Sequence, residues 1–364
     1  MVPATRWLAV AAVAVGIVSA PLATHALPVH DTTISAVRLA DRINDTADLG
    51  WSGEVSSLGS VQVPLSGSTF GGASRLLGER TDLRVWWRDA ENWRIDRLRA
   101  TGESDLVRDG GLTVRWDYED NRVNFTPWSS IRLPDDVDVV PVSLALRLLA
   151  GATPRELSRL PAERVAGRGA VGLRLVPADK RSTISRVDVW ADESSGLPLR
   201  VQVYGEPAGL PILSTEVISL DLRRPAKENA DFQLSPTLDF SRGVALDVAA
   251  GANAFAPFIP PEKIAGLHRL RHGEDLGAVG LYGRGPTAVL AVPLRGAVAD
   301  ELRTQLRRSR SARNTGPGVA MEVGPLSVLL QHSRTGNFLL VGTVTPKTLE
   351  AAAADLTAGG VRTE

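Results

Sequence analysis

Residues 83–98 read LRVWWRDAENWRIDRL, and this stretch decides the fold that we predict. Apolar and charged side chains alternate on both sides of a polar turn at residues 89–92, which is the pattern of a β-hairpin. Because successive side chains of a strand point to opposite faces, the hairpin has one apolar and one charged face. The apolar face is predicted to carry Leu83, Val85, Trp87, Trp93 and Ile95.

The next segment repeats this arrangement after a turn at residues 109–111. Its predicted apolar row is Leu112, Val114, Trp116 and Tyr118. Further strands with a period of two are predicted at residues 171–175, 187–189, 197–203 and 213–222. Consecutive antiparallel strands therefore form a sheet with one face rich in aromatic rings. The residues alone leave open whether these rings are a plain core or line a hollow for an acyl chain.

Two helical segments accompany the strands. An amphipathic helix is predicted over residues 33–43. Residues 142–150 are apolar around nearly the whole helix, and Gly151 is placed to end it in a left-handed cap. A capping box at residues 153–156 predicts a second short helix through Leu160. The predicted fold class is α+β, with an antiparallel sheet covered by helices.

The chain divides into four predicted parts. Residues 1–26 have the layout of a secretory signal peptide, and an uncleaved N-terminal membrane anchor is the alternative. Either reading places the body of the protein outside the cytoplasm, in the periplasm or cell envelope. Residues 30–240 form the sheet domain, residues 241–257 form a linker rich in glycine, alanine and proline, and residues 258–364 form a smaller α+β domain.

Composition and motifs argue against catalysis. The 41 basic and 41 acidic residues cancel, which disfavours nucleic acid as a partner, and the absence of cysteine removes thiol chemistry. His268 and His272 have helical spacing but lack a third ligand, and the acidic residues at 135–138 read as a solvated loop beside Arg132. We therefore predict no catalytic residue, no metal and no cofactor.

One basic patch stands out, at Arg303, Arg307 and Arg308. Cations are favoured at the C-terminal end of any helix, so the patch has a purely structural explanation. Contact with an acidic partner or a membrane surface is the functional alternative.

The order of elements resembles the LolA-type lipoprotein-binding fold, and more closely its two-domain MucB/RseB branch. The resemblance rests on WSGE at residues 51–54, the WWRDAENWRID hairpin, LVRDGGLTVRWDYEDNRV, VSLALRLLAG, VDVWADESSGLPLRVQVY and LLVGTVTPKTLEAAAADL. It implies a half-barrel whose concave side is apolar, covered by helices and without catalytic activity. By position it places Trp87, Trp93, Trp116 and Leu112 on the inner face, and Leu144, Leu148 and Leu149 on the covering helix.

Two functions follow from this resemblance. The first is a non-enzymatic lipid sensor or carrier that takes lipid or lipoprotein acyl chains into the half-barrel. The alternative is an RseB-like regulatory module that binds a membrane anti-sigma factor or an ABC transporter in envelope-stress signalling.

Overall fold

The computed structural model describes residues 31–61, 71–99, 102–128, 132–206, 209–232, 239–241, 252, 258–270, 277–333, 336–359 and 361–362. The predicted signal or anchor lies outside the described residues, and so does most of the predicted linker, so the domain boundaries stay a prediction. Among the helices in these ranges, none combines the length and apolar character that a bilayer crossing requires.

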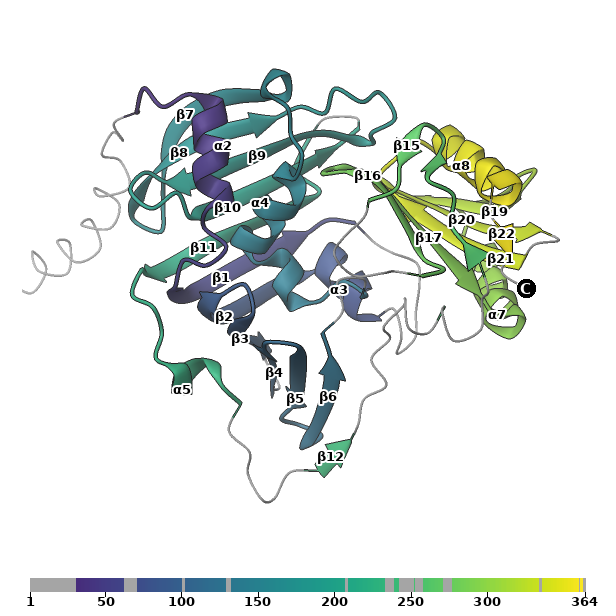
Figure 1. Ribbon diagram of the computed structural model, residues 1–364. Coiled ribbons are helices and arrows are strands. Elements are labelled where there is room, and N and C mark those ends of the chain that lie inside the picture. Colours follow the sequence, from purple (N-terminus) through teal and green to yellow (C-terminus); the bar gives the residue numbers. More distant parts are fainter. Residues whose placement is uncertain are drawn as a thin grey trace, which may run out of the picture.

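Twelve strands form the larger sheet (Figure 1). In chain order they are β1 (Trp51–Gly59), β2 (Arg80–Asp89), β3 (Asn92–Arg99), β4 (Gly102–Asp109), β5 (Leu112–Asp117), β6 (Arg122–Pro127), β7 (Leu157–Val165), β8 (Arg168–Leu175), β9 (Ile184–Asp192), β10 (Pro198–Gly205), β11 (Leu213–Asp221) and β12 (Asp239–Ser241). Across the sheet they lie in the order β12-β6-β5-β4-β3-β2-β1-β11-β10-β9-β8-β7. The short edge strand β12 runs parallel to β6, and all other neighbours are antiparallel. This open antiparallel sheet confirms the predicted half-barrel.

The predicted hairpin is β2–β3. Trp87 pairs with Trp93 and Val85 with Ile95, so these side chains share one face of the sheet. Asp89 closes the turn, because its Oδ1 accepts hydrogen bonds from the Glu91 amide at 3.0 Å and the Asn92 amide group at 2.7 Å. Turn chemistry within four residues therefore fixes the register of the pair.

Two helices lie on one face of the larger sheet, α2 (Ala36–Asn44) and α4 (Pro141–Leu149) (Figure 1). α2 contacts β7 and β8, α4 contacts β10 and β11, and the two helices contact each other. The short η1 helix (Asp136–Val139) leads directly into α4. α4 ends as predicted, with Gly151 in the left-handed region at a φ of 69°. Two further helices, α3 (Gly71–Gly78) and α5 (Lys227–Ala230), lie against β1–β2 and β2–β3.

The predicted second helix after Gly151 is wrong. The capping box of Thr153 and Glu156 is present, but η2 (Pro154–Glu156) has only three residues. Leu157 already pairs with Leu175 at the start of β7. The backbone beyond Glu156 bonds to the neighbouring strand instead of continuing the helical turn, so tertiary pairing overrides the local signal.

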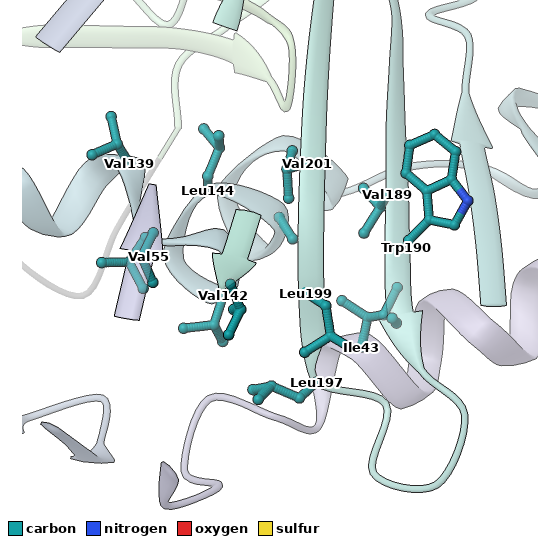
Figure 2. Close-up of a cluster of buried hydrophobic side chains, with 14 of the residues drawn as sticks. Ile43, Val55, Val139, Val142, Leu144, Val189, Trp190, Leu197, Leu199 and Val201 are labelled. Atoms are coloured by element: carbon teal, nitrogen blue, oxygen red, sulfur yellow. The ribbon is translucent and has the colours of Figure 1, made fainter. Parts of the chain in front are cut away.

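The main core lies between the larger sheet and its helices. α2 contributes Leu39 and Ile43, α4 contributes Val142, Leu144 and Leu149, and both halves of the sheet contribute valines and leucines. Figure 2 shows members of this core from α2, η1, α4, β1, β9 and β10. An apolar stripe on each helix is thus buried against the apolar face of the strands.

A smaller six-stranded antiparallel sheet follows, which confirms the predicted α+β C-terminal region. Its strands are β16 (Gly280–Arg284), β17 (Thr287–Leu294), β18 (Ala312–Asn314), β19 (Gly318–Val323), β20 (Leu326–Ser333) and β21 (Gly336–Gly342), in the order β16-β17-β21-β20-β19-β18. Helices α7 (Gly296–Arg308) and α8 (Pro346–Gly359) pack against it. Four two-residue strands form two small ladders: β13 (Phe258–Ile259) with β22 (Val361–Arg362), and β14 (Lys263–Ile264) with β15 (Leu267–His268).

The two sheets meet through apolar contacts, such as Val61 packed among α7 and β19–β20, and through hydrogen bonds. Arg284, at the end of β16, donates to the Gly151 carbonyl at 2.8 Å and to the Glu156 carboxylate at 2.9 Å. The Thr183 amide donates to the Thr343 carbonyl at 3.1 Å. These contacts tie the C-terminal end of α4 directly to the smaller sheet.

Candidate functional site

We define the inner face as the side of the larger sheet that α2 and α4 cover, and the outer face as the opposite side. The first predicted row lies on the inner face, where Leu83, Val85, Trp87, Trp93 and Ile95 are all buried. Leu144 and Leu149 of α4 are buried in the same core, and Leu148 is half-buried against it. The structure therefore brings the predicted hairpin residues and the covering helix together.

The tryptophans of the hairpin stack on one another. The Trp87 and Trp93 ring centroids lie 6.0 Å apart with an interplanar angle of 6°, and the Trp87 indole donates to the Ala47 carbonyl at 2.9 Å. Trp128 meets Trp93 edge-on at 5.9 Å. Offset stacking and edge contacts are the arrangements that the ring quadrupoles favour, so the three rings form a fixed aromatic group.

The second predicted row, Leu112, Val114, Trp116 and Tyr118, does not lie on this face. Ile95 pairs with Leu106, and Leu106 pairs with Arg115, so Arg115 faces inward and its neighbours in sequence face outward.

The side chains of Leu112 and Tyr118 are 40% and 62% exposed. Val114 and Trp116 belong to a separate outer cluster with Val107, Val123 and Phe125. The alternation within β5 is as predicted, but the register set by β4 turns its apolar row to the outer face.

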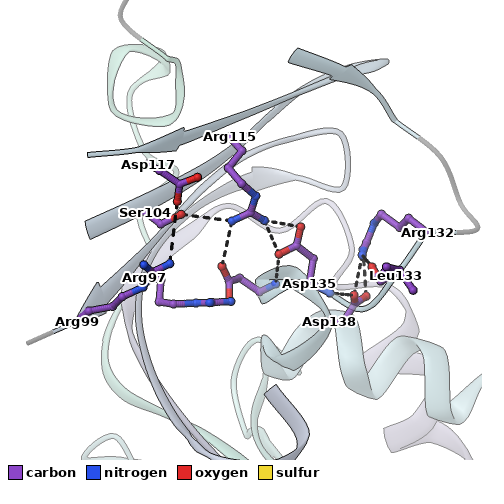
Figure 3. Close-up of polar contacts among 10 residues, drawn as sticks. Arg97, Arg99, Ser104, Arg115, Asp117, Arg132, Leu133, Asp135 and Asp138 are labelled. Atoms are coloured by element: carbon purple, nitrogen blue, oxygen red, sulfur yellow. Dashed lines mark hydrogen bonds and ion pairs between the residues drawn. The ribbon is translucent and has the colours of Figure 1, made fainter. Parts of the chain in front are cut away.

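Beyond Ile95 the inner face is charged. The strands supply Arg97 and Arg115, and the segment before α4 supplies Arg132, Asp135 and Asp138 (Figure 3). Asp136 of η1 and Arg147 of α4 complete the group. We call these seven residues the arginine–aspartate cluster. The predicted solvated loop at residues 135–138 is therefore wrong: Asp136 is fully buried, at 0% exposed.

Ion pairs join the strands to η1. Arg97 Nε donates to Asp136 Oδ1 at 2.7 Å, and Arg115 Nη2 contacts both Asp135 oxygens at 2.5 Å. Arg115 also faces Asp136 at 3.9 Å. Two arginines of the sheet thus hold the two aspartates at the start of η1 by charge, beside the apolar packing of Val137 and Val139 in the core.

A second set of ion pairs lies within residues 132–149, the segment that contains η1 and α4. Asp138 accepts from Arg132 at 2.6 and 3.0 Å, from Arg147 of α4, and from the Asp135 amide at 2.6 Å in a capping box. Burial by itself raises the pKa of Asp138, but the charges of Arg147 and Arg132 outweigh burial and bring the pKa to about 2.

The pKa values of Asp135 and Asp136 shift in opposite directions. Burial, with the added charge of Asp135, raises the pKa of Asp136 despite Arg97 and Arg115. Burial acts on Asp135 too, but the charge and hydrogen bond of Arg115 lower its pKa. Asp136 Oδ2 accepts no hydrogen bond from any described residue, so among these seven residues this carboxylate is the least satisfied.

Trp128 connects the aromatic group to these charges. The guanidinium of Arg108 lies 3.9 Å from its ring centroid, and that of Arg132 lies 4.8 Å away. On the inner face the aliphatic core, the aromatic group and the charged cluster therefore adjoin one another. Such a surface can bind an amphipathic ligand, with its apolar part on the aliphatic side and its polar end toward the arginines.

The predicted basic patch lies on α7, in the smaller domain. Arg303 pairs with Asp300, whereas Arg307 and Arg308 lie exposed in the last turn of the helix. Neither forms an ion pair with any residue in the described ranges. His268 is exposed in β15, and His272 lies outside the described residues.

Residues 139–235 match the family model of the MucB/RseB N-terminal domain. The predicted resemblance to the MucB/RseB family is confirmed. The matched segment contains α4 and β7–β11, including the two quoted motifs at residues 142–151 and 187–204, while the β2–β3 hairpin lies outside it. No curated protein matches the chain.

Solved structures give weaker likenesses. The MucA/MucB complex of Pseudomonas aeruginosa aligns at 18% identity over 90% of this chain and 99% of that chain, with a TM-score of 0.49. A crystal structure of MucB aligns at 16% identity over 88% and 96%, with a TM-score of 0.45. The LolA superfamily protein NE2245 from Nitrosomonas europaea aligns at 13% identity over 55% and 99%, with a TM-score of 0.26. The likeness to the MucB/RseB family therefore rests on the matched segment, residues 139–235.

Replacing Asp138 with asparagine tests the charged end of the site. We expect the Asp138→Asn variant to lose about 2 kcal/mol of unfolding free energy at neutral pH, because a buried carboxylate with two arginine partners is removed. The wild-type contribution is present above the ordinary pKa of aspartate and is lost as the pH falls toward about 2. Urea unfolding at several pH values measures both effects.

Asp221→Asn is the matched control, because Asp221 pairs with Arg223 at the surface. We expect little change in this variant, since solvent screens exposed pairs. Equal stability losses in the two variants would contradict a special role for the buried pairs.

Proposed function

We propose that this protein is a non-enzymatic binding module of the cell envelope that takes a lipid or lipoprotein acyl chain onto the inner face of its half-barrel. The observation that carries the proposal is a continuous apolar inner face beneath α4, within a segment that matches the MucB/RseB N-terminal domain. Burying an acyl chain there gains about 25 cal/mol per Å² of apolar surface. An aliphatic surface of this kind suits a hydrocarbon better than a polar ligand.

The ligand would enter between α4 and the sheet. Leu144, Leu149 and the half-buried Leu148 pack against the strands, and an acyl chain would replace these contacts with its own. α4 is only nine residues long, and its approach through η1 is held by ion pairs as well as by buried valines of the core. Exchanging one apolar partner for another costs little free energy, so α4 is suited to displacement by an acyl chain.

A second function, regulation of a partner protein, is favoured by the contact between α4 and the smaller domain. Arg284 bonds to Gly151 at the end of α4, and Leu148 O lies 2.7 Å from the position that a Cβ on Gly285 would occupy. A ligand that moves α4 would therefore disturb the hairpin that carries Arg284. We propose that a membrane anti-sigma factor or an ABC transporter binds the smaller domain, with Arg307 and Arg308 in the contact.

The lipid proposal is tested by placing a negative charge on α4, beside the apolar inner face. We expect Leu148→Glu to lose the lipid that wild-type protein retains through export and purification, because a buried carboxylate opposes an acyl chain. Organic extraction and mass spectrometry of the purified protein measure the lipid content. Leu112→Glu is the control, since Leu112 is exposed on the outer face. Equal lipid in all three proteins, or none in the wild type, would count against the proposal.

The partner proposal is tested by charge reversal on α7. We expect the Arg307→Glu and Arg308→Glu double variant to bind the extracytoplasmic segment of a neighbouring-gene anti-sigma factor or transporter about tenfold more weakly at low salt. Binding is followed by calorimetry. The control reverses Lys263 and Lys347, two exposed cations of the same domain. An identical loss in both double variants would refute a specific role for α7.

A further inference from the structure

Three carboxylates converge on the outer face of the larger sheet. Asp96 of β3 and Asp105 of β4 pair directly in the register, and each is only 1% exposed. Glu103 stands two residues before Asp105 on the same face of β4. One carboxylate oxygen from each of the three lies within 4.8 Å of the other two.

The protein's own cations do not balance this group. Arg94 donates to Asp96 Oδ1 at 2.7 Å and Oδ2 at 3.1 Å, and to Asp105 Oδ2 at 2.7 Å, which places one guanidinium against two buried carboxylates. Arg84 lies opposite Asp96 in β2 but is exposed and also opposite Glu54 in β1. Counting these two arginines against the four acids leaves two negative charges on this part of the sheet.

One buried oxygen of this group lacks a hydrogen-bond donor among the described residues. Asp105 Oδ1 is buried and accepts no hydrogen bond from the part of the chain that the structure describes, although the residue is almost completely enclosed. A buried acceptor without a donor is rare in folded proteins and costs free energy comparable to a lost hydrogen bond. Burial and the charge of Asp96 raise the pKa of Asp105 to about 7, and the same two causes raise that of Glu103.

We propose that Asp96, Glu103 and Asp105 bind one hard divalent cation, with Ca²⁺ as the best fit. The three ligands offer only carboxylate oxygens, which Ca²⁺ prefers, and two excess negative charges match one divalent ion. Arg94 would hold the far side of Asp96 and Asp105, as outer partners of metal-ligating carboxylates do. The ligands come from two strands, at positions 96, 103 and 105, so no contiguous sequence motif reveals them.

The two tryptophans beside the site provide a direct readout. Trp116 pairs with Asp105 in the register and Trp86 pairs with Arg94, so both rings lie on the same face as the carboxylates. Tb³⁺, a luminescent substitute for Ca²⁺, should therefore emit when the tryptophans of the full chain are excited. After EDTA treatment, we expect about 5 mM CaCl₂ to raise the thermal midpoint by about 3 °C or more, relative to KCl of equal ionic strength.

Three variants separate this site from general ion effects. We expect Asp105→Asn and Glu103→Gln to bind Tb³⁺ at least about tenfold more weakly and to lose the response to CaCl₂. Asp105→Asn should remain folded, because the change relieves repulsion with Asp96. Asp109→Asn, at the exposed end of the same strand, should behave as wild type.

These measurements show whether the three carboxylates bind a metal ion or share a proton. A wild-type protein whose midpoint and luminescence ignore Ca²⁺, Mg²⁺ and Tb³⁺ would overturn the proposal and leave a proton shared by the carboxylates. An equal loss in Asp109→Asn would also overturn it, because the response would then be nonspecific. Competition between Ca²⁺ and protons, seen as weaker binding at about pH 6 than at about pH 8, supports the proposed ligands.

Discussion

The pairing of Arg97 and Arg115 with Asp135 and Asp136 is the constraint on which the rest of the site depends. It joins two strands to the segment that leads into α4. The Arg97–Asp136 pair is buried, where each partner needs the other, and Arg115 and Asp135 are half-buried. A carboxylate left without its arginine in this setting would be strongly destabilising. The position of the covering helix over the apolar strands therefore follows from a few charged contacts near its start.

The two ends of the half-barrel are therefore stabilised by different kinds of interaction. The aliphatic end is held by close packing of α2 and α4 on the sheet, and the charged end by directional ion pairs. Packing tolerates a different apolar partner, whereas ion pairs hold only in one geometry. A binding protein built in this way can exchange the ligand on its inner face while η1, which leads into α4, stays in place. Arg284 then links the other end of α4 to the smaller domain.

The sequence predicts those features that local chemistry determines. The β2–β3 hairpin follows from a four-residue turn, and the end of α4 follows from Gly151. The inward orientation of Arg115 could not be predicted, because it depends on the register of β4 with both neighbours. The burial of Asp136 could not be predicted either, because its partner Arg97 is 39 residues away and charged residues beside prolines are typical of surface loops. Long-range pairing, not local propensity, decides both cases.

Native-state hydrogen exchange tests the central claim most directly, by comparing the amides of η1 and α4 with those of β2 and β3. The account predicts that residues 136–149 open with a smaller free energy than the hairpin strands. It also predicts that Arg97→Met speeds exchange in residues 136–149 by about tenfold or more while β9 and β10 stay protected. Exchange of all these amides with one common free energy, unchanged in relative order by the substitution, would contradict it.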